Sequence, residues 1–596
     1  MSGSVRCLER EVNSLEKIGS LLILGVWLLF LLLQNLGYWE VLQRKCNVEI
    51  EFLPALTCAV QISVLFFAGI LNLLLEAAVC LWLFGLLSLG YCVKQNRGLS
   101  FAKRYCNAGY LCLFLFLAAL VLHLHGATFS AGDDFTHWGL VAKSVLTTDH
   151  MPTMREAYIE YPDYPLGSAV FIYYCMRFSG AVTSEWQMML CQAYLALAFL
   201  LPMMLPLKKH RGVGFVVAVL LTEFFLKYNI RPSSLQVDTL LPLAGMAMLL
   251  YVFRYCAAGE TGKPSFYLAS AFIMAVSQIK SAGAFFVAIA LGYVMLEGKK
   301  DRQWKQRVIV VLVQLIVYLL WMKHRDYVFG YAGRHGVSIK EFSRVLAIHD
   351  KSELPVLIRS FVLRLASFKG NILCLCAAAV VRILYCTAGE RKQASDFLKL
   401  CGKVLLAYLA YMAALCVMYY TSMEVPGYET SLPGFDRYAQ TAVIAVLYGF
   451  GVLLMQRISE YQFRREKCAV AALLVLLPGL LWWQGIRKPF LLETPPVSAD
   501  RVKIENAMRY KYIKEGTSCA ILGVEEENLG PRYIAKYLFN NWDRENFTIN
   551  SMEDFRAVED YDPDYLIILD LENPYIQQWI QEKYPEYVGK TFIDLT

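Results

Sequence analysis

Charged residues are scarce in this chain of 596 residues, because Asp, Glu, Lys and Arg together make up only 18% of it. A soluble domain carries about 25% charged residues, so a single soluble globular fold is excluded. The mean hydropathy is +0.43, and apolar runs recur at about the 20-residue length that a bilayer crossing requires. We therefore predict a polytopic α-helical membrane protein.

Clusters of metal ligands are missing as well. The 17 cysteines are scattered, no Cys-x-x-Cys pair occurs, and no group of cysteine and histidine has the spacing of a zinc site. Free cysteine is commonly buried, so we predict that these are packing residues between helices. The net charge of +7 lies in short loops without interleaved aromatic residues, which is not the pattern of a nucleic-acid-binding surface.

Basic loops predict which helix ends face the cytoplasm, because Lys and Arg are retained on that side. The alternation of loops gives about 13 to 14 crossings at the length that a bilayer demands, from a first at 19–37 to a last at 468–484. We divide the chain into N-terminal membrane helices of unknown role at 1–107, a main membrane module at 108–484 and a soluble domain at 485–596.

The last of these parts differs sharply in composition, with frequent charges and no long apolar run. Short strand-like stretches alternate there with helical patterns, which predicts a small α/β domain. The predicted strands are 519–524, 565–569 and 591–595, and the predicted helices are 531–540 and 574–583. The count of crossings places this domain outside the cell.

An early loop carries two adjacent carboxylates, Asp133 and Asp134, where a membrane segment meets water. Ionisable side chains near lipid are costly, so the pair indicates a functional site. Asp133 could act as a general base, and Asp134 could orient the acceptor or share a divalent cation, Mg²⁺ or Mn²⁺, with it. The alternative for Asp134 is a helix N-cap. The amphipathic stretch that follows, 135–146, is predicted to lie flat on the membrane.

Two further segments are predicted on the outer side. The apolar run 165–181 is short, and the placement of the neighbouring basic loop favours a position along the membrane interface. The loop 323–368 carries many cations against the usual bias, and an anionic ligand would explain them. Pairing with nearby carboxylates or with lipid headgroups would explain them equally well. The cations of interest are Arg334, His335, Lys340 and Arg344.

The Asp133 loop resembles the first outer loop of the C-type (GT-C) integral membrane glycosyltransferases, a superfamily that includes protein mannosyltransferases and aminoarabinose lipid A transferases. The likeness lies in the Gly-Asp-Asp-Phe-Thr-His-Trp run at 132–138, the Tyr-Pro-x-Tyr-Pro-Leu corner at 161–166 and the tyrosine pair at 173–174. Members of the family have an Asp followed by Glu or Asp, then a membrane-parallel helix, then a Pro-Pro-Leu-Tyr-Tyr type of segment.

Three more matches follow in the order of the family. Asp238 precedes a long apolar run, Lys280 lies in a tight hairpin, and Arg437-Tyr438 opens a late helix. A soluble domain after the last helix also fits. Family members usually carry the Asp motif after their first helix, whereas several apolar segments precede it here, so the resemblance implies no role for 1–107.

The resemblance implies an enzyme that transfers a sugar, with inversion, from a polyprenyl-phosphate donor to a glycan, lipid or protein acceptor on the outer face of the plasma membrane. Asp133 would be the catalytic base. Lys280, Arg437 and Arg231 would hold the donor phosphate, and the cations of the 323–368 loop would close over it. The implied pocket residues are His137, Tyr161, Asp163, Tyr164, Asp238 and Tyr438.

Some of these residues have simpler alternatives. His137 could be a packing residue at the interface, and Lys280 could cap the C-terminus of a helix. A transporter or flippase of lipid-linked saccharides would need polar or broken helices near the midplane and often an internal repeat, and no repeat is visible. A polymerase or ligase of the O-antigen type would place its chemistry in a late loop, whereas the carboxylate pair comes early.

Overall fold

The computed structural model describes residues 2–596 apart from a set of short segments. Those segments are 97–99, 154–158, 160, 162–163, 181–182, 209–210, 230, 258–262, 298–302, 330–342, 344–346, 348–351, 388–390, 423–430, 461–478, 480–487, 509–516, 526–527 and 540–543. The predicted last crossing, 468–484, falls almost entirely within them.

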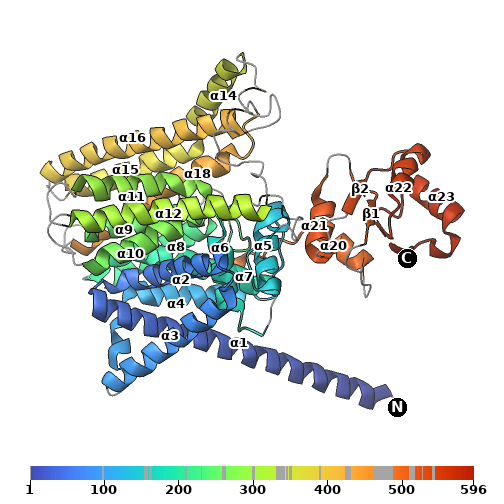
Figure 1. Cartoon of the computed structure of the whole chain (residues 1–596), viewed down its shortest axis with the longest axis horizontal. Coiled ribbons are helices and arrows are strands. Elements are labelled where there is room, and N and C mark those ends of the chain that lie inside the picture. Colours follow the sequence, from blue (N-terminus) through green and yellow to red (C-terminus); the bar gives the residue numbers. More distant parts are fainter. Residues whose placement is uncertain are drawn as a thin grey trace.

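Long helices packed side by side make up most of the molecule, and a small domain lies beyond one end of this bundle (Figure 1). The bundle helices are α1 Ser2–Cys46, α2 Leu53–Ile70, α3 Leu74–Gln95, α4 Ala108–Leu124, α7 Glu185–Leu200, α8 Arg211–Lys227, α9 Leu240–Tyr255, α10 Lys263–Ser277, α11 Ala284–Glu297, α12 Trp304–Phe329, α15 Lys369–Thr387, α16 Arg391–Ser422 and α18 Phe435–Glu460. The amphipathic helix α14, Glu353–Ser367, precedes α15.

Eight helices in the described part of the chain are long and apolar enough to cross a membrane, and five shorter apolar helices accompany them. The prediction of a multi-pass helical membrane protein is confirmed at this level. The apolar stretch 53–93 is a hairpin, as predicted, and its two helices are joined through Asn72, whose positive φ of 57° turns the chain. The helix α1 is much longer than the predicted span 19–37.

Helices α1 and α3 approach closely through small residues. A Cβ atom at Gly37 would lie 1.9 Å from the carbonyl oxygen of Gly85, so only hydrogen at these positions lets the two backbones meet. Small residues commonly allow such contacts between membrane helices, where packing replaces the hydrophobic effect as the driving force.

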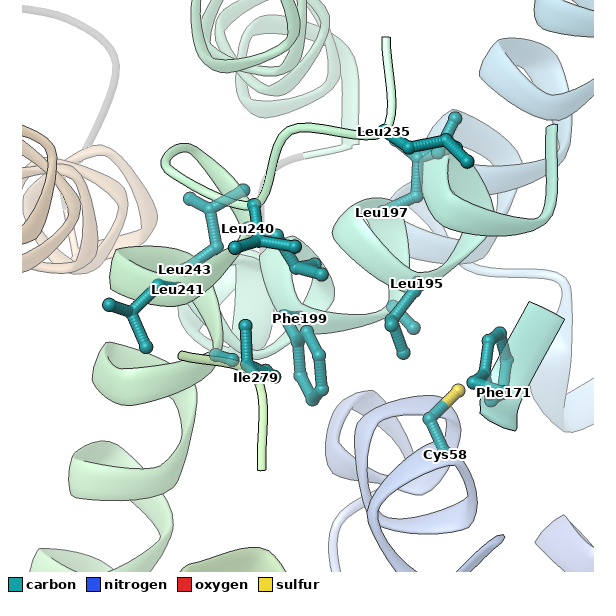
Figure 2. Packing of buried hydrophobic residues seen from close by; sticks show 14 of the residues in the cluster. Cys58, Phe171, Leu195, Leu197, Phe199, Leu235, Leu240, Leu241, Leu243 and Ile279 are labelled. Atoms are coloured by element: carbon teal, nitrogen blue, oxygen red, sulfur yellow. The ribbon is translucent and has the colours of Figure 1, made fainter. Parts of the chain in front are cut away.

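The core of the bundle is built around α7, which contacts α2 and the short helix α6, Gly167–Met176, and also α9. In Figure 2 Phe199 lies between Cys58 and Phe171 on one side and Leu243 and Ile279 on the other, and all five are buried. Cys58 therefore serves as a small packing residue, as the sequence predicted. The helix α2 comes from the N-terminal part of the chain and shares this core with later helices.

The segment 165–181 contains the helix α6, and its side chains face protein. All ten residues of α6 are buried, because helices α2, α5 and α7 cover them. Its tyrosine hydroxyls find partners inside the protein: Tyr173 donates to Asp149 at 2.7 Å and Tyr174 donates to Gln34 at 2.7 Å. A short apolar run with aromatic residues suits a protein interior as well as a lipid surface, and composition alone does not separate the two.

The C-terminal domain has a four-stranded sheet in the order β2-β1-β3-β4, with β1 parallel to β2 and β3 and with β4 antiparallel to β3. Its elements are α20 Ala499–Ala507, β1 Cys519–Leu522, α21 Gly530–Phe539, β2 Arg544–Phe547, α22 Phe555–Tyr561, β3 Tyr565–Ile568, α23 Pro574–Lys583 and β4 Phe592–Asp594. The predicted strands and helices all fall on these elements. The edge strand β2 was missed because Arg-Glu-Asn-Phe lacks the apolar alternation of a half-buried strand.

Substitution of Gly37 by Ala should lower the melting temperature by several degrees, because the added methyl group would meet Gly85 at 1.9 Å and overpacking costs about 1–3 kcal/mol. Gly90→Ala in α3 is the matched control, since a methyl group there meets no atom within 4 Å. Thermal unfolding of the purified proteins in detergent measures both. Equal melting temperatures would mean that α1 and α3 can separate without cost.

Candidate active site

Four segments that are far apart in the sequence meet at the end of the bundle that faces the C-terminal domain. They are the turn after α4 that carries Asp133 and Asp134, the loop between α8 and α9, the hairpin between α10 and α11, and the first turn of α18. The contact between Asp133 and Arg437 joins residues 304 positions apart. The structure thus brings together the motifs that the resemblance placed in one site.

A chain of alternating charges forms the centre of this site. Arg437 contacts Asp133 through Nη1, and its Nε lies 3.7 Å from Oδ2 of Asp238. The ammonium of Lys280 lies 2.6 Å from Oδ1 of Asp238. Exposure falls along the chain, since the Asp133 side chain is 40% exposed and that of Asp238 only 2%. The buried carboxylate is therefore neutralised by two cations, while the outer one is accessible from water.

The backbone explains how the two cations reach Asp238. Gly434 has a φ of +69° and turns the chain sharply into α18, which begins at Phe435 and so places Arg437 in its first turn. Lys280 is extended between α10 and the turn η6, Ser281–Gly283, and its ammonium points to Asp238. It does not cap the C-terminus of α10, which was the alternative.

Asp134 is fully buried and makes a different set of bonds. Its Oδ1 accepts hydrogen bonds from the Leu235 amide at 2.9 Å and from the Ser234 hydroxyl at 3.2 Å. The N-cap alternative does not describe this geometry, because the side chain ties two loops together and does not bond the amides of its own helix. Its Oδ2 has no hydrogen-bond partner among the described residues.

Burial raises the pKa of Asp134 to about 8, against the lowering effect of its bonds to Leu235 and Ser234. The carboxyl group is therefore neutral near pH 7. Asp133 engages Arg437, whereas Asp134 is directed to the neighbouring loop by its bonds to Leu235 and Ser234. Among the described residues, no group of three His, Cys, Asp or Glu side chains could hold a metal ion.

Aromatic rings line the next part of the site. His137 packs against Tyr164 with ring centroids 4.9 Å apart, Tyr161 and Tyr164 stack at 5.2 Å, and Trp138 lies 5.7 Å from Tyr164. Burial lowers the pKa of His137 to about 3, so the imidazole is neutral. His137 packs among aromatic rings, as expected if it is a packing residue.

Tyr438 contacts both cations of the charge chain. Lys280 lies 5.1 Å from the centre of the Tyr438 ring, and the Arg437 guanidinium lies 5.2 Å from it. Cations over the face of an aromatic ring are attracted by its quadrupole. This ring therefore helps to hold both cations in place.

Other predicted residues are not part of this arrangement. Arg231 lies on the loop after α8 but is exposed, and its charge acts on His123. Asp163 and the loop cations Arg334, His335, Lys340 and Arg344 lie outside the described residues.

The apolar face of 135–146 was predicted to lie on lipid, and this was wrong. This stretch forms the turn η3, Asp134–Trp138, and the helix α5, Gly139–Thr148, and its apolar residues are buried in protein. Phe135 packs against Tyr537 of the C-terminal domain with centroids 5.6 Å apart. The contacts of Tyr537 and of Ser234 with the aspartate turn were not foreseen, because neither residue stands in a pattern that marks it.

Comparison of the chain with protein-family models, with curated proteins and with solved structures found no match.

Asp134→Asn should stabilise the protein by an amount that grows between about pH 4 and pH 8. In this window the folded protein keeps a proton on Asp134 that the unfolded chain has lost, because the pKa is raised from 3.8 to about 8 on folding. Wild-type stability therefore falls as pH rises to about 8 and is independent of this group above it. Asn does not titrate, so the difference in melting temperature should widen with pH and then level off.

Thermal unfolding in detergent at several pH values measures this difference, with Asp436→Asn as the matched control. Asp436 is about half exposed and pairs with Arg364 at the surface. A difference between Asp134→Asn and wild type that stays constant across the pH range would contradict the raised pKa.

Proposed function

We propose that the protein is a membrane glycosyltransferase of the GT-C type, which moves a sugar from a polyprenyl-phosphate donor to an acceptor. The observation that carries the proposal is the charge chain Asp133–Arg437–Asp238–Lys280 at the end of the bundle. It joins an accessible carboxylate to two cations of the kind that bind phosphate most strongly. The resemblance of the same motifs to the GT-C enzymes supports the same function.

The chemistry follows from the exposure of each group. The acceptor oxygen forms a bond to the anomeric carbon of the sugar, the bond from that carbon to the phosphate oxygen breaks, and inversion results from attack on the opposite face. Asp133 takes the acceptor proton as general base, since its side chain is accessible from water whereas Asp134 is fully buried. Arg437 and Lys280 stabilise the charge that develops on the departing polyprenyl phosphate.

The ion pair between Arg437 and Asp133 gives this reaction an order. Arg437 holds the Asp133 carboxylate in an ion pair. A donor phosphate that takes hydrogen bonds from Arg437 would loosen this pair and leave the Asp133 carboxylate free to turn to the acceptor. Binding of the donor would therefore prepare the base for the acceptor.

The acceptor is a glycan, lipid or protein of the cell envelope. We propose that the site and the C-terminal domain face the outside of the plasma membrane, after about 13 to 14 crossings of a normal bilayer thickness. A transporter of lipid-linked saccharides is the second candidate, but its binding groups would be expected near the midplane. Asp238 precedes α9 and Arg437 lies in the first turn of α18. Both lie at the end of the bundle, beside the turn that contacts the C-terminal domain, which favours an enzyme.

Asp133→Asn should reduce sugar transfer by roughly a hundredfold or more, because Asn keeps the shape of the side chain but cannot accept the proton. Transfer from a panel of radiolabelled polyprenyl-phosphate sugars in membranes measures this, at equal protein levels. Asp436→Asn changes the neighbour of Arg437 and should stay within twofold of wild type. Equal transfer by wild type and Asp133→Asn would refute the assignment of Asp133 as general base. A wild-type protein that consumes no donor on a broad panel would favour the transporter.

Lys280→Met should lower both stability and transfer, because it removes a partner of the buried Asp238 carboxylate. Breaking a buried ion pair in this way costs about 3–5 kcal/mol. The double variant Lys280→Met/Asp238→Asn removes both charges and should recover most of the melting temperature but none of the transfer. Recovery of transfer in the double variant would mean that Lys280 serves only to hold the fold.

A further inference from the structure

The C-terminal domain contacts the turn that carries the two aspartates. Arg501 of α20 is only 5% exposed, and its Nη1 lies 2.7 Å from Oε2 of Glu185 at the start of α7. The same guanidinium lies 5.9 Å from the centre of the Phe135 ring, next to Asp134. Its Nε donates to Glu505 at 2.8 Å, which fixes its orientation.

Glu185 connects Arg501 to the backbone before the aspartates. Its Oε2 also accepts a hydrogen bond from the Phe129 amide at 2.6 Å, and Nη1 of Arg501 lies 3.5 Å from the Phe129 carbonyl oxygen. The backbone amide and the carbonyl oxygen of Phe129 are thus both bound by one buried ion pair. Removal of either charge would leave the other buried without its main partner, which is costly.

A second group of contacts comes from Tyr537 of α21. Its ring packs against Phe129 at 5.7 Å and against Phe135 at 5.6 Å. Its carbonyl oxygen accepts a hydrogen bond from Lys143 of α5 at 2.6 Å. These three partners lie before and after Asp133 and Asp134 in the chain, so the domain holds the aspartate turn on both sides.

We infer that the C-terminal domain completes the active site, with Arg501 and Tyr537 as positioning residues that hold the Asp133–Asp134 turn against Arg437 and Leu235. A general base must stay within hydrogen-bond reach of the proton it takes, and small displacements are costly in rate. The domain therefore governs the rate of a reaction that takes place in the membrane module. The catalytic part of this inference rests on the proposed function, whereas the positioning part rests on the contacts alone.

Hydrogen–deuterium exchange of the full-length protein in detergent tests the positioning. Arg501→Gln should speed exchange at the Phe129 amide and in η3 by at least tenfold. Arg501→Lys should give a smaller increase, because an ammonium that keeps the contact with Glu185 has no second nitrogen to bond Glu505. Arg532→Gln is the matched control, since Arg532 pairs with Glu545 at 3.3 Å on the surface of the same domain. It should exchange like wild type.

Sugar transfer by the same proteins tests the catalytic consequence. Arg501→Gln should lower kcat about tenfold and leave the donor KM within twofold, because Arg501 lies outside the charge chain that binds phosphate. Faster exchange with an unchanged kcat would overturn the catalytic role, and unchanged exchange at Phe129 would overturn the positioning itself. Exchange decides the positioning even where no donor is consumed, so a failure of the proposed function is told apart from a failure of this inference.

Amides of β1 and β3 report whether Arg501→Gln still folds. If they also exchange faster, Glu185→Met removes both the ion pair and the acceptor of the Phe129 amide from the membrane side without altering the domain. It should free the Phe129 amide while the strands stay protected. Protection of Phe129 in this variant would contradict the inference.

Discussion

Neutralisation of the buried Asp238 carboxylate is the constraint on which the site depends. A carboxylate at 2% exposure is costly unless cations and hydrogen bonds compensate it. Lys280 and Arg437 supply the compensation from two different parts of the chain, so the α10–α11 hairpin and the start of α18 must meet beside α9. Because Arg437 also reaches Asp133, the same requirement places the outer carboxylate next to the cations.

Much of the fold could be predicted from the sequence, because membrane helices and small α/β domains leave strong local patterns. Long apolar runs marked the bundle helices, and the alternation after residue 485 marked β1, β3, β4, α21 and α23. The members of the charge chain were also foreseen, but Asp238, Lys280 and Arg437 were singled out by their resemblance to motifs of the GT-C enzymes and not by a local pattern of their own.

What covers each apolar face could not be predicted. Phe135 and the residues of α6 are apolar and aromatic, and lipid or protein would satisfy them equally well; in the structure protein covers both. The bonds from Ser234 and Leu235 to Asp134 were hidden for another reason, since a backbone amide has no sequence signature. Arg501 and Tyr537 also carry no local pattern, because their partners are more than three hundred positions away.

The separation of the site along the chain sets an order in which a growing polypeptide can assemble it. Leu235 follows Asp134 by 101 positions, and Lys280 follows Asp238 by 42 positions, so these two contacts can form early. Arg437 reaches Asp133 only after 304 positions, and Arg501 reaches Glu185 after 316. A chain arrested during insertion therefore holds its buried acids but lacks the guanidinium and the domain that complete the site. The charge chain and its support are therefore completed last, when α18 and the C-terminal domain have been made.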